Sequence, residues 1–497
     1  MRATHKMLAW TIYISFIGVL VLMLLPKGNA ALARKVALLF AAAGLGIGIA
    51  GFAQFKAGEI VTVSDIPWVP SLGIHYLLAA DGVSLTLVLL TGIAAVVGIL
   101  FSWNIEHRAK EFFAFYLALI GGVYGVFLSF DLFLLFVFYE IAIVPKYFII
   151  AIWGSTRREY GAMKLALYSF VGSAMVLIGL IAAYVISGAH TFNVEELAQY
   201  PFPHEFQMWA FPLVFIGFAI LAGMWPFHTW APTGHVAAPT AASMLLAGVV
   251  MKLGAYGCLR MAMTLFPDGL AAWKNVFAAL AIIGIIYGAM VALVQKDFKF
   301  VIGYSSVSHM GFVLLGLMSL NAIGLSGAVL QMFSHGIIAG LLFAVVGRMV
   351  YDRTHTRDLD ELHSMRLGKA LPFVAGTFVI ACIASMGMPG FSGFAAEFQV
   401  IIGAWKAFPT LAILTGIGIL IGIAYTLRAL LKAFFGEGEE PGERPHEPMP
   451  PISFPEKLGA LLLIAVSLAI GLFPRILLDI IVPSFNSPLF DWLRRTP

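Results

Sequence analysis

Long apolar runs separated by short polar loops dominate the chain. About 20 apolar residues cross a bilayer as a helix, and an unpaired backbone group is costly in lipid, so each run is expected to be helical. The pattern predicts an all-α polytopic membrane protein with about fourteen transmembrane helices. The runs fall at about 7–25, 36–53, 82–102, 111–128, 131–152, 163–186, 208–225, 243–265, 275–295, 301–319, 325–348, 370–402, 409–434 and 457–475.

Two of these runs are interrupted by residues that break helices. Pro226, Pro232 and Pro239 fall at the end of the seventh run and just after it, while Pro389 and Gly390 interrupt the twelfth. Most single prolines only kink a helix. Broken helices at matching places, five runs apart, are instead typical of transporters that contain two inverted repeats and expose polar backbone near the membrane midplane.

The distribution of basic residues predicts the orientation. Loops after odd-numbered runs carry roughly twice as many lysine and arginine residues as the other loops and the termini, with Arg260 assigned to the latter group. This bias predicts an integral protein of the bacterial cytoplasmic (inner) membrane with both termini on the non-cytoplasmic side. The N-terminal apolar stretch is interpreted as the first span rather than a signal peptide. The polar segment EGEEPGERPHEPMPP, from residue 436, is expected to be a cytoplasmic linker.

Composition excludes several classes of protein. The chain is 61% hydrophobic and only 11% charged, whereas a soluble domain has roughly 25% charged residues. Its two cysteines, Cys258 and Cys382, have no CxxC spacing, and no haem, zinc, iron–sulfur or nucleotide motif is present. We therefore expect no cofactor and no metal in this chain. A net charge of +4 gives no reason to expect a nucleic acid partner.

Several ionisable residues lie deep inside apolar runs. They are Glu140 in LFVFYEIAIVPKYFII, Lys252 in LLAGVVMKLGAYGCL, His335 in QMFSHGIIAG and Glu397 after the twelfth-run break. Burial favours the neutral form of such groups, and a nearby opposite charge favours the charged form. Groups with this balance can take up and release protons. The alternative is a structural role, as ion pairs between helices or as a satisfied core histidine.

Other polar residues lie near breaks or run ends. For His228, His235 and His309, capping or packing is as plausible as proton transfer. Asp297 and Lys299 fall between the ninth and tenth runs, where a solvated turn is expected.

The chain resembles a known family at these positions. The matching stretches are FYEIAIVPKYF, PFHTWAPTGHVAAPTAASMLLAGVVMKLGAYGCLR, DFKFVIGYSSVSHMGFVLLG, QMFSHGIIAG, YDRTHTRDL and MPGFSGFAAEF. They are similar to the antiporter-like subunits of proton-pumping NADH:quinone oxidoreductase (respiratory complex I), most closely the subunit M (chain 4) type, within the Mrp-type antiporter superfamily.

This resemblance implies two inverted five-helix repeats, spans four to eight and nine to thirteen. The expected division is 1–110 for the first three helices, 111–265 and 275–434 for the repeats, and 435–497 for the linker, the last helix and the tail. It also implies proton translocation coupled to quinone reduction, with NADH, FMN, iron–sulfur clusters and quinone bound by other subunits. Neighbouring antiporter-like subunits would be partners. A sodium/proton antiporter, a membrane-bound hydrogenase subunit and a scaffold that has lost pumping are the alternatives.

The resemblance also implies roles for individual residues. Glu140 matches the glutamate of the family's charge pair, Lys252 its central lysine, and Glu397 the residue that gates the outer half-channel. Glutamate at that last position is typical of subunit M. Leu221 stands where the family has the lysine partner of the glutamate, and Lys146 stands where an apolar residue is common. We hypothesise that Lys146 replaces the missing lysine. Alternatively, it extends to the cytoplasmic interface.

Overall fold

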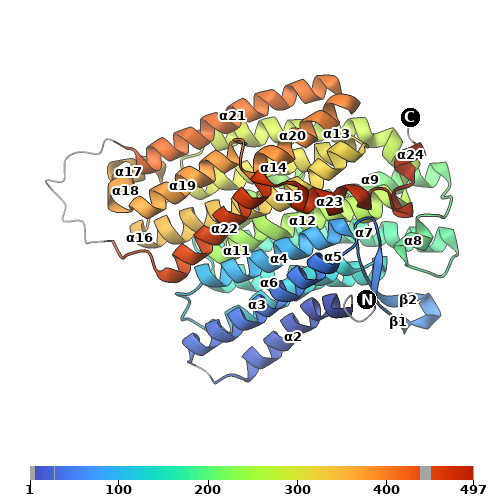
Figure 1. The fold of residues 1–497 in the computed structure, drawn as a ribbon, viewed down its shortest axis with the longest axis horizontal. Coiled ribbons are helices and arrows are strands. Elements are labelled where there is room, and N and C mark those ends of the chain that lie inside the picture. The colour runs from blue at the N-terminus through green and yellow to red at the C-terminus, as the bar shows by residue number, and fades with distance from the viewer. Residues whose placement is uncertain (1–5, 27, 437–448, 496–497) are drawn as a thin grey trace.

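The long helices run side by side in one bundle, with α2 and α3 at one edge and α21 at the opposite edge (Figure 1). The computed structural model describes residues 6–26, 28–436 and 449–495. Most of the expected cytoplasmic linker lies outside the described residues. The core is apolar throughout, because helices of membrane proteins present apolar side chains both to one another and to lipid.

Within the described residues, thirteen helical segments are long and apolar enough to cross a membrane. They are η1–α2 (Lys6–Leu24), α3 (Ala30–Gln54), α4 (Gly82–Phe101), α5 (Ala109–Leu128), α6 (Leu132–Trp153), α7 (Arg158–Ser187), α9–α10 (His204–Ala237), α11–η5 (Thr240–Met263), α13 (Pro267–Val294), α14 (Phe298–Met318), α15–α16 (Ala322–Thr354), α21 (Pro409–Phe434) and α22 (Phe454–Leu472).

Shorter helices complete the described chain. They are α8 (Val194–Leu197), α17 (Leu359–Ser364), α18 (Leu367–Ala370), α19 (Pro372–Ser385), α20 (Ser392–Ala407), α23 (Arg475–Ser484) and α24 (Trp492–Arg495). The mostly helical membrane fold predicted from the sequence is confirmed. The inverted repeats and the division at 1–110, 111–265, 275–434 and 435–497 stay predictions.

Both predicted helix breaks are present. Helix α9 (His204–Ala222) ends at Gly223, which adopts a left-handed conformation, and the chain continues through a short turn into α10 (Trp230–Ala237). The twelfth run is divided into α19 and α20 by residues 386–391, which include Pro389. Each break removes backbone hydrogen bonds from the middle of the bundle, because proline has no N–H to donate.

A β-hairpin was not expected from the sequence. Strand β1 (Val61–Val69) pairs antiparallel with β2 (Ile74–Ala80), with Ile66 opposite Tyr76. The segment between the second and third runs is too polar for a span, and its β-branched residues favour strands. The turn ends at Gly73, whose φ is +66°. A Cβ there would lie 1.7 Å from the His190 carbonyl oxygen, so only glycine fits.

Helices α15 and α20 touch through glycine. A Cβ added to Gly403 of α20 would lie 2.3 Å from the Cα of Gly324 of α15, and one added to Gly327 would lie 2.7 Å from the Val400 nitrogen. Small residues allow such backbone contact between membrane helices. This contact holds together the two helices that carry Gln331 and Glu397.

One buried ion pair joins distant parts of the chain. Asp81 caps α4 and lies 2.7 Å from Nη2 of Arg260, and both side chains are inaccessible to solvent. The guanidinium also donates to the Tyr256 hydroxyl at 3.0 Å and lies 4.7 Å from the Phe130 ring centroid. The assignment of Arg260 to a loop is therefore wrong, because Asp81 compensates its charge inside the protein.

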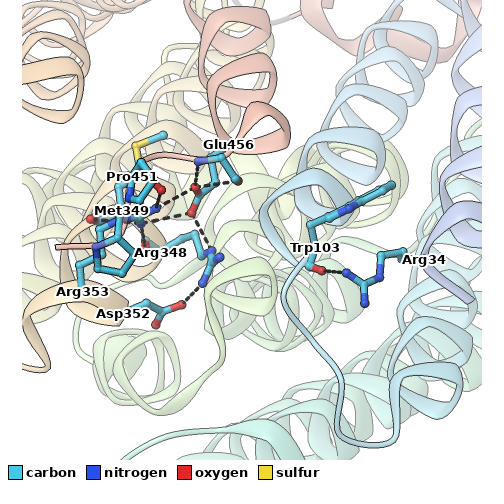
Figure 2. Close-up of polar contacts among 10 residues, drawn as sticks. Arg34, Trp103, Arg348, Met349, Asp352, Arg353, Pro451 and Glu456 are labelled. Carbon is cyan, nitrogen blue, oxygen red and sulfur yellow. Dashed lines mark hydrogen bonds and ion pairs between the residues drawn. The ribbon is translucent and has the colours of Figure 1, made fainter. Parts of the chain in front are cut away.

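A second buried carboxylate anchors α22 (Figure 2). Glu456 is 1% exposed, and its oxygens lie 2.8 Å from Nε of Arg348 and 2.9 Å from Nη2 of Arg353. Glu456 also accepts a hydrogen bond from the Ser453 backbone nitrogen in a capping box. The two arginines belong to η6 (Ala344–Tyr351) and α16 (Asp352–Thr354). The carboxylate thus ties the start of α22 to the end of α15.

We expect Glu456→Ala to destabilise the protein strongly. Removing one partner of a buried ion pair costs about 3–5 kcal/mol, because it leaves buried charge uncompensated. The check is thermal unfolding of the purified protein, with Asp360→Ala as the control. Asp360 forms ion pairs with Lys296 and Lys432 at the surface, where solvent screens such pairs. Equal losses in the two variants would contradict the anchoring role of Glu456.

Candidate functional site

Lys252 lies on α12 (Met251–Gly257) and is fully enclosed. A π-helical segment, η4 (Leu246–Val250), directly precedes this helix. Such segments leave carbonyl groups displaced from the regular ladder and are frequent at functional sites. The amine donates to the Ala247 carbonyl oxygen and lies 2.7 Å from Nδ1 of His335. At that distance an ammonium donates to a neutral imidazole nitrogen, so the two groups share one proton rather than carrying two charges.

A row of side chains continues from His335. Helix α15 (Ala322–Phe343) carries His335, and its ring centroid lies 5.5 Å from that of His309 on α14. Nδ1 of His309 lies 2.8 Å from Oε1 of Glu397, and Nε2 of Gln331 donates to the same oxygen at 3.0 Å. Helices α12, α14 and α15 lie in the middle of the bundle (Figure 1). The row Lys252–His335–His309–Glu397 therefore runs between helices through the interior.

Two small cavities flank the end of this row. The first is lined by His335, His309 and Glu397 and has about 10 Å³ free to the centre of a water molecule, roughly what one water needs. The second has about 20 Å³, lies on the other side of His309 and Glu397, and is lined by Tyr425 of α21. The Tyr425 hydroxyl donates to Ser305 at 2.7 Å. Glu397 thus borders both cavities.

The expectation of a solvated turn is wrong for Lys299. This side chain is 3% exposed and donates to the Ala238 carbonyl oxygen at 3.0 Å. It also lines a recess of about 470 Å³ that is bordered by Arg348 and Asp352. Lys299 is buried because α14 begins at Phe298, capped by Asp297, so its stem already lies inside the bundle.

His235 lies between Lys299 and Lys252 in electrostatic terms. It is fully buried on α10 and interacts electrostatically with both lysines. Neither ring nitrogen has a hydrogen-bond partner among the described residues. His235 therefore extends the row from Lys252 toward the recess at Lys299.

Glu140 and Lys146 lie apart from this row, both on α6. Lys146 is 1% exposed, so its side chain does not extend to the interface as one alternative proposed. No ion pair or hydrogen bond joins the two side chains within the described part of the chain, although they interact electrostatically. Leu221, the position of the expected lysine, is a buried apolar residue. The replacement hypothesis stays a prediction.

Of the site residues predicted from the sequence, the structure brings Lys252, His335 and Glu397 into one row. Sequence reasoning gave too little weight to His309 and Lys299 and missed Gln331. His309 had a signal, an imidazole within the tenth apolar run. Gln331 had none, because its importance depends on Glu397, which lies 66 residues away along the chain.

Comparison with known proteins places the chain in a family. Residues 129–422 match the family described as NADH:quinone oxidoreductase/Mrp antiporter, TM. The chain belongs to this family. Its relatives include NADH-quinone oxidoreductase subunit M of Rhodobacter capsulatus, 36% identical over 449 residues, which cover 88% of this chain and 86% of that protein. Subunit M of Escherichia coli (strain K12) is 34% identical over 493 residues, covering 95% and 96%.

Solved structures of the family agree in fold. The chain matches respiratory complex I from Thermus thermophilus with bound NADH at a TM-score of 0.87 and 28% identity, covering 97% of this chain and 99% of that chain. The Mrp complex from Dietzia sp. DQ12-45-1b matches at a TM-score of 0.85 and 22% identity, covering 98% of each chain. At that identity the second match shows the fold alone. The chain is an integral membrane protein of a family found in multi-subunit complexes.

We expect His309→Ala to lower thermal stability by about 1–3 kcal/mol, because it removes one of the two hydrogen-bond donors to the Glu397 carboxylate. Thermal unfolding of the purified protein measures the loss. The control is His204→Ala, whose side chain is 70% exposed beside Asp268 and should have little effect. If both variants unfolded like the wild type, the hydrogen bond to Glu397 would not contribute to stability.

Proposed function

We propose that the chain is the M-type proton-translocating membrane subunit of an NADH:quinone oxidoreductase. The observation that carries this proposal is the continuous row Lys252–His335–His309–Glu397 in the middle of the bundle. NADH, FMN, iron–sulfur clusters and quinone are assigned to other subunits. This chain contributes groups that exchange protons.

The row supports a sequence of proton transfers. The Lys252 ammonium releases a proton to Nδ1 of His335, across 2.7 Å. His335 then releases a proton from Nε2, which has no partner among the described residues and lines the first cavity. One water there passes the proton to His309, which delivers it to Glu397 at 2.8 Å. The chain of groups then returns to its starting state, because each has gained one proton and lost one.

Access to the row is proposed from the recess at Lys299. The recess is also lined by Ser102, Glu106 and Ser155, from loops whose basic residues predict the cytoplasmic side. His235 interacts electrostatically with Lys299 and Lys252 and supplies an intermediate imidazole. At the other end, protons leave from Glu397 through the cavity beside Tyr425. We place the protein in the bacterial cytoplasmic membrane, with both termini on the opposite side from the recess.

Neighbouring membrane subunits, including other antiporter-like chains, are the proposed partners. An Mrp-type sodium/proton antiporter is the less favoured alternative. Relatives that are at least 34% identical over most of the chain bear the name subunit M, whereas the Mrp structure matches at only 22% identity. A hydrogenase subunit and a scaffold that has lost pumping are separated from the proposal by measurement.

We expect Lys252→Ala to reduce proton translocation at least about tenfold, because a positioned proton-transfer group contributes about 10²-fold or more to such steps. The measurement is acidification of the lumen of vesicles that contain the intact complex, driven by quinone reduction. The control is Lys56→Ala, an exposed lysine outside the bundle. Unchanged pumping in Lys252→Ala would favour the scaffold alternative. Sodium-dependent pumping by the wild type would favour the antiporter.

A further inference from the structure

The pair of helices α6 and α7 contains four buried polar atoms without hydrogen-bond partners among the described residues. They are Oη of Tyr139, Oε1 of Glu140, Nζ of Lys146 and Oγ of Ser169. Buried polar groups in proteins are almost always satisfied by protein atoms or by ordered water. Four such atoms on two adjacent helices therefore indicate a shared solvent site rather than four separate defects.

The relative positions of these groups follow from one contact. The carboxylate of Glu140 interacts with the hydroxyl of Ser173 on α7. Helices α6 and α7 pack together and are joined by a short turn, so they run antiparallel. Ser169 precedes Ser173 by one turn, about 6 Å along the axis, and Lys146 follows Glu140 by about 9 Å. Ser169 thus lies at a depth between the carboxylate and the amine.

Proline adds another acceptor on the α6 side. Helix α6 continues through Pro145, but proline has no N–H and cannot donate to the carbonyl four residues earlier. That carbonyl belongs to Ile141, which lies between Glu140 and Lys146 along the helix. Its oxygen is free to accept a hydrogen bond from water in the same interval.

The charges complete the site. Lys146 is 1% exposed, and Glu140 is the carboxylate with which it interacts electrostatically. Their separation is beyond direct ion-pair contact. A buried amine and carboxylate that attract each other without touching need a bridging medium, since neither is otherwise solvated.

We propose that Glu140 and Lys146 exchange a proton through water held along α6 and α7 by the hydroxyls of Ser169 and Ser173 and by the carbonyl of Ile141. An N–H bond of the Lys146 ammonium breaks, an O–H bond forms on Glu140, and the water between them is restored after each transfer. The pair therefore alternates between two charges and none. This inference rests on the proposed function, because it gives the pair a place in proton translocation.

Ser169→Ala in the intact complex tests the role of the hydroxyl. We expect it to lower quinone-driven proton pumping several-fold, while Ser169→Thr, which keeps the hydroxyl, restores most of it. Ser326→Ala is the matched control, because Ser326 is also a buried serine whose hydroxyl has no partner among the described residues but lies on α15. Equal effects of Ser169→Ala and Ser326→Ala would overturn the proposal.

Glu140→Gln, Lys146→Met and the double variant test the pairing. Groups that act as one unit are not additive, so we expect the double variant to pump no less than the weaker single variant. Independent, additive losses would overturn the pairing. Lys252→Ala separates this outcome from the proposed function. If Lys252→Ala abolishes pumping and the α6–α7 variants do not change it, only the inference fails, whereas normal pumping by Lys252→Ala refutes the function itself.

Infrared spectroscopy gives a readout that a purely structural role would not change. The carboxyl band lost in Glu140→Gln identifies Glu140 in a redox-induced difference spectrum of the complex. We expect Lys146→Met and Ser169→Ala to shift or abolish that band, and Ser326→Ala to leave it in place. An unaltered Glu140 band in Lys146→Met would show that the two groups do not exchange a proton.

Discussion

A charged amine enclosed in a lipid-embedded protein is the constraint from which the site follows. Lys252 has no access to solvent, so every requirement of its ammonium group must be met by protein atoms nearby. The π-helical segment before it supplies the Ala247 carbonyl, and α15 supplies the imidazole of His335. Both partners are needed because neither alone satisfies three donors. The local distortion of the helix and the approach of α15 are thus consequences of one buried nitrogen.

Charge is distributed in two ways in this bundle. Arginine stays protonated under all physiological conditions, and the buried arginines are found in fixed pairs, Arg260 with Asp81 and Arg348 with Glu456. These pairs fasten helices to each other. The interior row contains only lysine, histidine and glutamate, whose protonation can change. The chain therefore separates the charges that hold the structure from those that can be transferred.

Much of the fold could be predicted because hydrophobic run length follows bilayer thickness. The helix breaks were visible as prolines, and four of the interior ionisable residues stood out against apolar neighbours. Contacts between helices could not be predicted in the same way. Gln331 gains its importance from Glu397, and Arg260 is buried only because Asp81 lies beside it. Lys299 was misassigned because its position near a turn resembles solvent exposure, although its helix begins one residue earlier.

The glycine contact between α15 and α20 restricts how the row can respond to a proton. With Gly403 and Gly324 in backbone contact, neither helix can turn or slide against the other without separating. Gln331 and Glu397 are therefore mounted on a rigid frame. A change of charge at Glu397 must be answered by rotation of side chains such as His309 and by rearranged water, over ångströms. In mechanical terms, this half of the molecule works as a fixed housing with small moving parts rather than as a pair of rocking domains.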